Sequence, residues 1–244
     1  MQRGTARKPT HDDLYYDDLV VFRVEDILFK VPRRIFEGTS GVFATMFTLP
    51  AGDSEVEGIH DNNPIQLPPD ISAFDLRSVL KACYPIYPLG SCPADLTKNE
   101  WLSVLKLATM WDYRDLRKRS IERLDALDLE DIERIILGRR FHVSAWLVKS
   151  YEALARRDET LTEEEGGLVG VGTVCQLAKL RELSWHFARV ATPHRTIISG
   201  RDCFDFTSAI HDMLENELRE DEDYEPPQPP QPLQPSQWRN RVRI

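Results

Sequence analysis

The residues that most often bind metals are scattered along this chain of 244 residues. A zinc site usually needs two closely spaced pairs of Cys or His ligands. No CxxC, HxH or HExxH pattern occurs, and we therefore predict no metal site. The four cysteines are Cys83, Cys92, Cys175 and Cys203, and the six histidines are His11, His60, His142, His186, His194 and His211.

Patterns typical of nucleophilic or nucleotide chemistry are also missing from the sequence. The stretch GGLVGVG at 166–172 follows no predicted strand and precedes no Lys-Ser or Lys-Thr, as a phosphate-binding loop requires. No GxSxG motif is present. The acidic residues at 130–133 and 215–217 are interpreted as solvated helix faces. We therefore predict no catalytic residues, no cofactor and no enzymatic activity.

The net charge of −9 is unevenly distributed. Residues 215–225 carry seven acids and one Arg, whereas the stretch WRNRVRI at 238–244 carries three positive charges. An acidic body argues against a nucleic-acid surface, because phosphate binding needs clustered Lys and Arg. The basic pairs are interpreted as solvated helix faces. They are Arg33–Arg34, Arg139–Arg140 and Arg156–Arg157.

The location expected from the sequence is cytoplasmic or nuclear. No apolar run approaches the ~20 residues that cross a bilayer, so no membrane contact is expected. Residues 1–18 are polar and contain no apolar signal-peptide core.

The first half of the chain predicts a hairpin that leads directly into a helix. Residues 20–24 and 27–31 alternate with period two, and Glu25–Asp26 would form the turn between two strands. Val20, Phe22 and Val24 would share one face of the hairpin. Pro32 ends the second strand because it has no N–H to donate. Ser40 is a candidate N-cap for a helix over 41–47, and a short strand is expected around 65–67.

Several helices are predicted after this strand. Ser72 with Asp75 and Thr97 with Glu100 have the spacing of capping boxes. A third helix is expected over about 112–127, and further helices follow as far as about 220. The stripe expected to face the core from the first of these helices is Phe74, Leu76, Val79, Leu80 and Cys83.

The order of these elements and their residues resembles the BTB/POZ domain, most closely that of fungal BTB proteins. The stretch LVVFRVEDILFKVPRRIFEGTSGVFATMF carries the family's strand and helix pattern over about 18–127. The fold implied is α+β, with a small sheet flanked by helices and an all-α C-terminal region. The expected domains are a disordered N-terminus at 1–13, a BTB/POZ-like domain at 14–127, a helical extension at 128–214 and a disordered tail at 215–244. That tail is acidic and then proline-rich.

The resemblance implies a protein-interaction and oligomerisation module that acts as an adaptor or scaffold, and it implies a homodimer. Residues expected in self-association are Leu14, Tyr15, Phe43, Met46 and Phe47. Phe43 and Phe47 are also expected to contribute to the core, and the core role is the larger of the two. Asp18 and Arg33 stand near the positions of the family's charged pocket. The family's His-Arg pair appears here as Pro32–Arg33.

Two partner classes are compatible with this resemblance. The chain could be a substrate adaptor that binds a cullin, or it could recruit a transcriptional co-regulator. The loop at 48–63 has no good match to the apolar-x-Glu motif of cullin adaptors, and no DNA-binding element accompanies the domain. The alternative to the family resemblance is an all-α structural or enzyme-associated protein that only mimics the pattern. An enzyme whose site the sequence does not reveal is a further, less favoured alternative.

Overall fold

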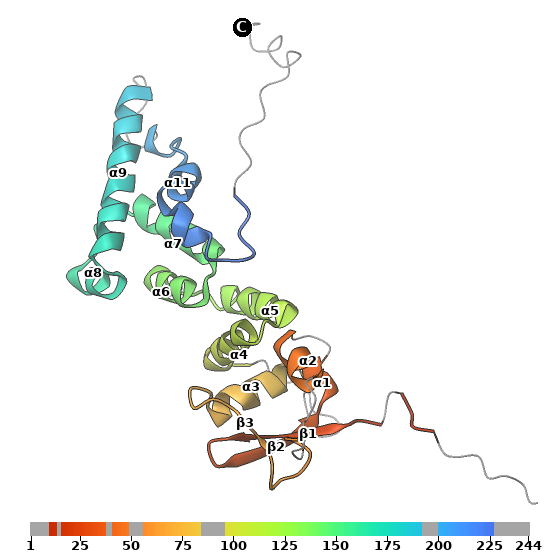
Figure 1. Cartoon of the computed structure of the whole chain (residues 1–244). Coiled ribbons are helices and arrows are strands. Elements are labelled where there is room, and N and C mark those ends of the chain that lie inside the picture. Colours follow the sequence, from red (N-terminus) through yellow and green to blue (C-terminus); the bar gives the residue numbers. More distant parts are fainter. Residues whose placement is uncertain are drawn as a thin grey trace, which may run out of the picture. The chain divides into compact units, whose positions relative to one another are not determined.

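The computed structural model describes residues 10–13, 16–37, 41–48, 56–83, 96–191 and 200–226. The chain divides into two compact units, 1–128 and 129–244, which are described separately (Figure 1). The first unit contains a three-stranded sheet, whereas the described part of the second consists of helices and their connections. The fold class is therefore α+β, as predicted, and the all-α alternative is wrong.

The predicted hairpin and its two-residue turn are confirmed. Strand β1 (Leu19–Val24) pairs antiparallel with β2 (Ile27–Pro32), and Val24 lies opposite Ile27. Glu25 adopts a φ of 54°, a left-handed conformation that tight hairpin turns require. Strand β3 (Ile65–Gln66) pairs parallel with β1 on its other side, which gives the sheet order β2-β1-β3.

One face of the hairpin is buried as predicted, with Val20, Phe22 and Val24 almost fully enclosed. Val21 points to the other face and is nevertheless buried. Its backbone N–H donates to the carbonyl of Gly58 at 2.7 Å, so the segment around Gly58 lies alongside β1. Gly58 has a φ of +82°, and a Cβ there would lie 2.8 Å from Ile65 Cδ1, so only glycine fits this approach.

The helices of the first unit are α1 (Arg34–Glu37), α2 (Gly41–Thr48), α3 (Ala73–Cys83), α4 (Lys98–Met110) and α5 (Arg114–Asp125). Both predicted capping boxes are confirmed. The Ser72 hydroxyl accepts from the Asp75 N–H at 3.1 Å, and the Asp75 carboxylate accepts from the Ser72 N–H at 3.1 Å. Thr97 and Glu100 make the same reciprocal pair at the start of α4.

The predicted core stripe of α3 is wrong at two positions. Phe74 is 46% exposed and Cys83 is also exposed, whereas Leu76 and Val79 are buried. Phe74 and Leu76 are two residues apart, which places them about 200° apart around a helix. The helix can therefore bury one of them against the unit, and it buries Leu76.

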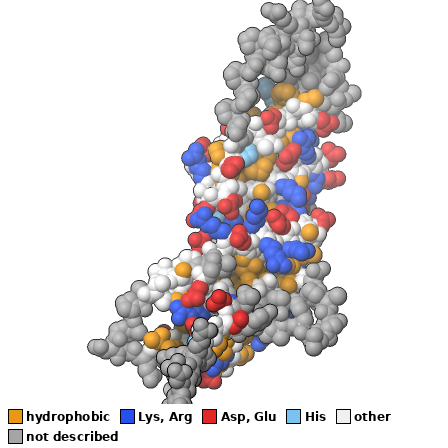
Figure 2. Space-filling view, turned by 90° about the vertical axis from the view of Figure 1, so that its right-hand side faces the viewer, with side chains coloured by type: hydrophobic (Ala, Val, Ile, Leu, Met, Phe, Trp, Pro, Cys, Tyr) orange, Lys and Arg blue, Asp and Glu red, His pale blue; other side chains and the backbone are white. Residues whose placement is uncertain are grey.

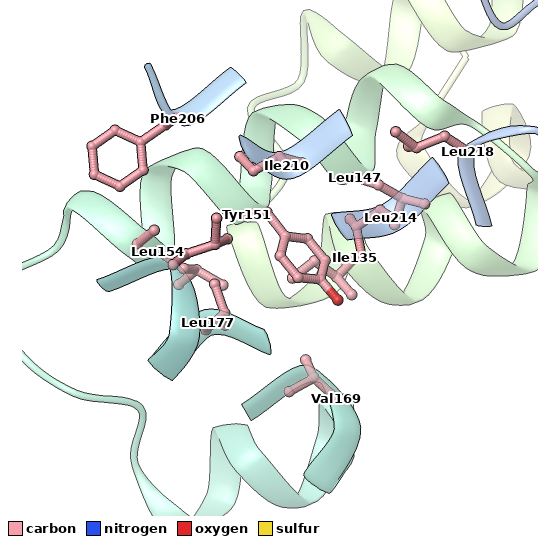
Figure 3. Close-up of a cluster of buried hydrophobic side chains, with 12 residues drawn as sticks. Ile135, Leu147, Tyr151, Leu154, Val169, Leu177, Phe206, Ile210, Leu214 and Leu218 are labelled. Atoms are coloured by element: carbon pink, nitrogen blue, oxygen red, sulfur yellow. The ribbon is translucent and has the colours of Figure 1, made fainter. Parts of the chain in front are cut away.

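The second unit contains α6 (Asp131–Phe141), α7 (Ser144–Arg156), α8 (Glu163–Val169), α9 (Val171–Ala191) and α11 (Phe206–Leu218). Four residues of α11, spaced at i, i+4, i+8 and i+12, point into the core of this unit (Figure 3). They are Phe206, Ile210, Leu214 and Leu218. They pack against α7 through Leu147, Tyr151 and Leu154, and this packing makes α11 part of the folded unit.

The prediction that 215–244 is disordered is wrong for residues 215–226. Residues 215–218 complete α11, and the following segment returns to the start of α7. There the Asp221 carboxylate accepts hydrogen bonds from the backbone N–H and the hydroxyl of Ser144, both at 2.8 Å. The acidic stretch is ordered because its carboxylates have specific donors. Residues 227–244 lie outside the described part of the chain, as do residues 1–9 of the predicted N-terminal segment.

The basic pairs are not simply solvated. Arg139 donates to Glu217 at 2.6 Å, and Arg157 makes a bidentate pair with Glu165 at 2.8 and 2.8 Å. On the face shown in Figure 2, basic and acidic side chains are interspersed. These arginines therefore connect elements of the second unit to one another.

Replacing Glu165 by glutamine should make the second unit less stable at neutral pH and leave it almost unchanged in acid. The Arg157 guanidinium and the Thr162 backbone N–H lower the pKa of Glu165 from 4.5 to about 2. Because the folded-state pKa lies below the unfolded value, the carboxylate stabilises the unit fully above pH 4.5 and loses this effect as the pH falls toward about 2. Glutamine can still accept a hydrogen bond from the Thr162 N–H. The comparison therefore reports the effect of the negative charge alone.

Thermal melts of both proteins between pH 7 and pH 3 measure this effect. We expect the difference in melting temperature to stay constant from pH 7 to about pH 5 and to narrow as the pH falls further toward 3. A difference that stays constant down to pH 3 would mean that the pair with Arg157 does not account for the stabilisation.

Candidate interaction surface

An aromatic cluster around Phe43 positions helix α2 on the sheet. The Phe43 ring centroid lies 5.0 Å from those of Phe36 and Trp111, and it lies 5.8 Å from that of Phe22. Phe43 is 2% exposed. Edge-to-face arrangements such as those with Phe22 and Trp111 are favoured geometries for aromatic pairs.

Because of this packing, the residues expected in self-association differ in how much of their surface is exposed. Phe43 has almost no surface with which to touch a second molecule, so its side chain belongs to the core of its own unit. Met46 and Phe47 remain partly exposed. Leu14 and Tyr15 lie outside the described residues.

Arg33 shields Phe47. Its guanidinium lies over the Phe47 ring at 4.4 Å from the centroid, and it donates to the Phe47 carbonyl at 3.3 Å. Its charge is matched by Glu37, with Nε 2.5 Å from Oε1. The cation therefore fixes the end of α2 while leaving part of the ring at the surface.

The expected charged pocket takes a different form in the structure. The backbone N–H of Arg33 donates to the carbonyl of Asp18 at 2.8 Å, so the two residues are neighbours through their main chains. The side-chain ion pairs are Arg33 with Glu37 and Arg34 with Asp17, the latter at 2.8 Å. The Asp18 side chain is exposed. The negative charge beside Arg33 is therefore supplied by Glu37 in place of Asp18.

The outward face of α2 carries an apolar pair, Val42 and Met46. Residues four apart lie on the same side of a helix, one turn from each other. Val42 is 47% exposed, and Met46 is partly exposed. Met46 is among the residues expected in self-association, and Val42 lies one turn away from it on the same side of the helix. We call Val42 and Met46 the α2 face.

The described residues contain neither a metal-binding cluster nor a membrane-spanning helix. Among them, no three His, Cys, Asp or Glu side chains are grouped so as to hold a metal ion. No helix in these ranges is long and apolar enough to span a membrane.

Comparison of the chain with protein-family models, with curated proteins and with solved structures finds no match.

Proposed function

We propose that the first unit is a protein-interaction and oligomerisation module of the BTB/POZ type, and that it self-associates through the α2 face. The family assignment is supported by the order of elements, which follows the predicted sequence of hairpin, two helices, strand and three helices. It is also supported by the position of β1 between an antiparallel hairpin partner and the parallel strand β3.

The observation that carries the proposal is the exposure of Val42 and Met46 on a helix whose other side is fixed by aromatic packing. The helix backbone is already formed, so only the side chains would lose conformational freedom on association. In a two-fold dimer each residue occurs twice, so four apolar side chains would be buried. Burying one large apolar side chain from full exposure is worth about 1.5–3 kcal/mol. Val42 and Met46 are partly buried already, so each would add a fraction of that value to the dimer interface.

The role that we propose for the dimer is that of an adaptor or scaffold. A cullin and a transcriptional co-regulator are both candidate partners. The arrangement of Arg33 with Glu37 supports neither one over the other.

The test is the substitution Met46→Glu, with Met110→Glu as the matched control. Met110 is 41% exposed at the end of α4, so both changes place a carboxylate on a surface of the same unit. A carboxylate buried at the dimer contact without a partner should weaken association roughly 100-fold or more. We expect Met46→Glu to be a monomer by light scattering, with an unchanged melting temperature for the monomer, and Met110→Glu to remain a dimer. If Met46→Glu keeps the wild-type mass, the α2 face is not the interface.

A further inference from the structure

A groove of about 440 Å³ lies on the second unit between α7, α11 and the segment that follows α11. Ala145 and Val148 of α7 supply its apolar surface, and His211 and Tyr224 line the opposite side. A volume of this size is typical of ligand sites in proteins.

The wall of the groove is held in place by specific contacts. The Tyr224 hydroxyl lies 2.7 Å from His211 Nδ1, and the two rings are stacked with an interplanar angle of 20°. Asp221 anchors the same segment to Ser144, as described above. The groove is therefore formed before any occupant arrives.

The charged residues that line the groove are two carboxylates and one ammonium. Glu152 and Glu225 line it together with Lys149. Glu152 is paired with Arg156 at 2.9 Å, whereas Glu225 is exposed and has no ion pair within the part of the chain that the structure describes. Glu225 also belongs to the stretch 215–225, which has seven acids and one Arg. A cationic occupant with an apolar side chain fits this surface.

We propose that the groove binds the chain's own basic segment, residues 238–243. This segment reads WRNRVR, so it combines an indole ring with three guanidinium groups. The indole would cover Ala145, Val148 and Tyr224, and the guanidinium groups would face Glu225. The pairing explains why strongly acidic and strongly basic stretches occur so close together in one chain.

The connecting chain is long enough for this contact. The described residues end at Pro226, next to the groove-lining Glu225, and residues 227–237 separate Pro226 from Trp238. A chain of eleven residues spans about 18 Å when flexible and about 34 Å when fully extended as polyproline II. The groove follows α7 from Ser144 to Glu152, a distance of about 12 Å at 1.5 Å per residue. A tether of this length also gives an effective concentration of about 1 mM.

The experiment measures binding of a fluorescent peptide, residues 236–244, to the chain ended after 235. We expect a Kd of about 100 µM or tighter, weakened by added salt because the contact is electrostatic. The full-length chain should bind the peptide roughly tenfold more weakly, because its own segment occupies the groove at about 1 mM. Equal binding by the two chains, or no binding to the shortened one, would overturn the proposal.

Point substitutions in the shortened chain locate the site. Glu225→Lys should reduce peptide affinity at least fivefold, and Lys149→Gln should increase it. Glu182→Lys is the matched control, because Glu182 is exposed on α9 and does not line the groove. An equal loss of affinity in Glu225→Lys and Glu182→Lys would show that the peptide responds to overall charge and that the groove is not its site.

Discussion

Replacing Phe43 by alanine is expected to lower the free energy of unfolding of the first unit by about 3–5 kcal/mol. The ring contacts aromatic side chains from the sheet, from α1 and from the end of α4, and it is almost fully enclosed. Alanine would leave a cavity that rigid rings cannot fill by small movements.

The control for this change is Phe74→Ala, which removes the same side chain from an exposed position. It should cost less than about 1 kcal/mol. Hydrogen exchange read on peptides from β1, β2 and α1 reports the stability of the first unit separately from the second. Equal losses of protection from hydrogen exchange in Phe43→Ala and Phe74→Ala would contradict the role of Phe43 in the core of the first unit.

Replacing Arg139 by alanine is expected to lower the stability of the second unit by about 2–4 kcal/mol. Its guanidinium donates to the Glu217 carboxylate, to the Val169 carbonyl at 3.0 Å and to the Tyr151 hydroxyl at 2.9 Å. These partners belong to α11, α8 and α7, so one side chain connects three helices to α6. Glu217 and Tyr151 would both lose a donor in a partly buried site, although the residual exposure of the ion pair moderates the cost.

Arg140→Ala is the matched control, since its side chain is exposed on the same helix. The stability of Arg139→Lys should lie between those of Arg139→Ala and Arg140→Ala. An ammonium retains the charge but cannot reach three acceptors as the planar guanidinium does. The stability of all three variants is measured by chemical denaturation, with hydrogen exchange in α6 and α11 as the readout. If Arg139→Ala is as stable as Arg140→Ala, the hydrogen bonds of Arg139 do not contribute to the stability of the second unit.

Features that depend on neighbouring residues in the chain could be predicted from sequence. The turn at Glu25–Asp26 and the caps at Ser72 and Thr97 are determined by residues within three positions of one another. For the same reason the order of elements in the first unit was predictable, because each element carries its own hydrophobic period and end signals.

Features that depend on distant contacts could not be predicted in this way. The pairing of Arg139 with Glu217 joins residues 78 positions apart. The sequence alone does not show this pairing, and the acidic stretch therefore has the pattern of a disordered tail. The orientation of α2 about its own axis is another example. Phe43 and Met46 are both apolar, and the sequence does not show that Trp111 covers Phe43. The apolar period identifies a helix but does not specify which side of it the rest of the unit will bury.

The molar mass of the full-length chain by light scattering, at micromolar concentrations, tests the proposed self-association most directly. We predict a value near twice the 28.2 kDa of one chain, falling to that of a single chain for Met46→Glu. A wild-type mass of 28.2 kDa across the accessible concentration range would contradict the proposal, and Val42 and Met46 would then be ordinary exposed residues of α2.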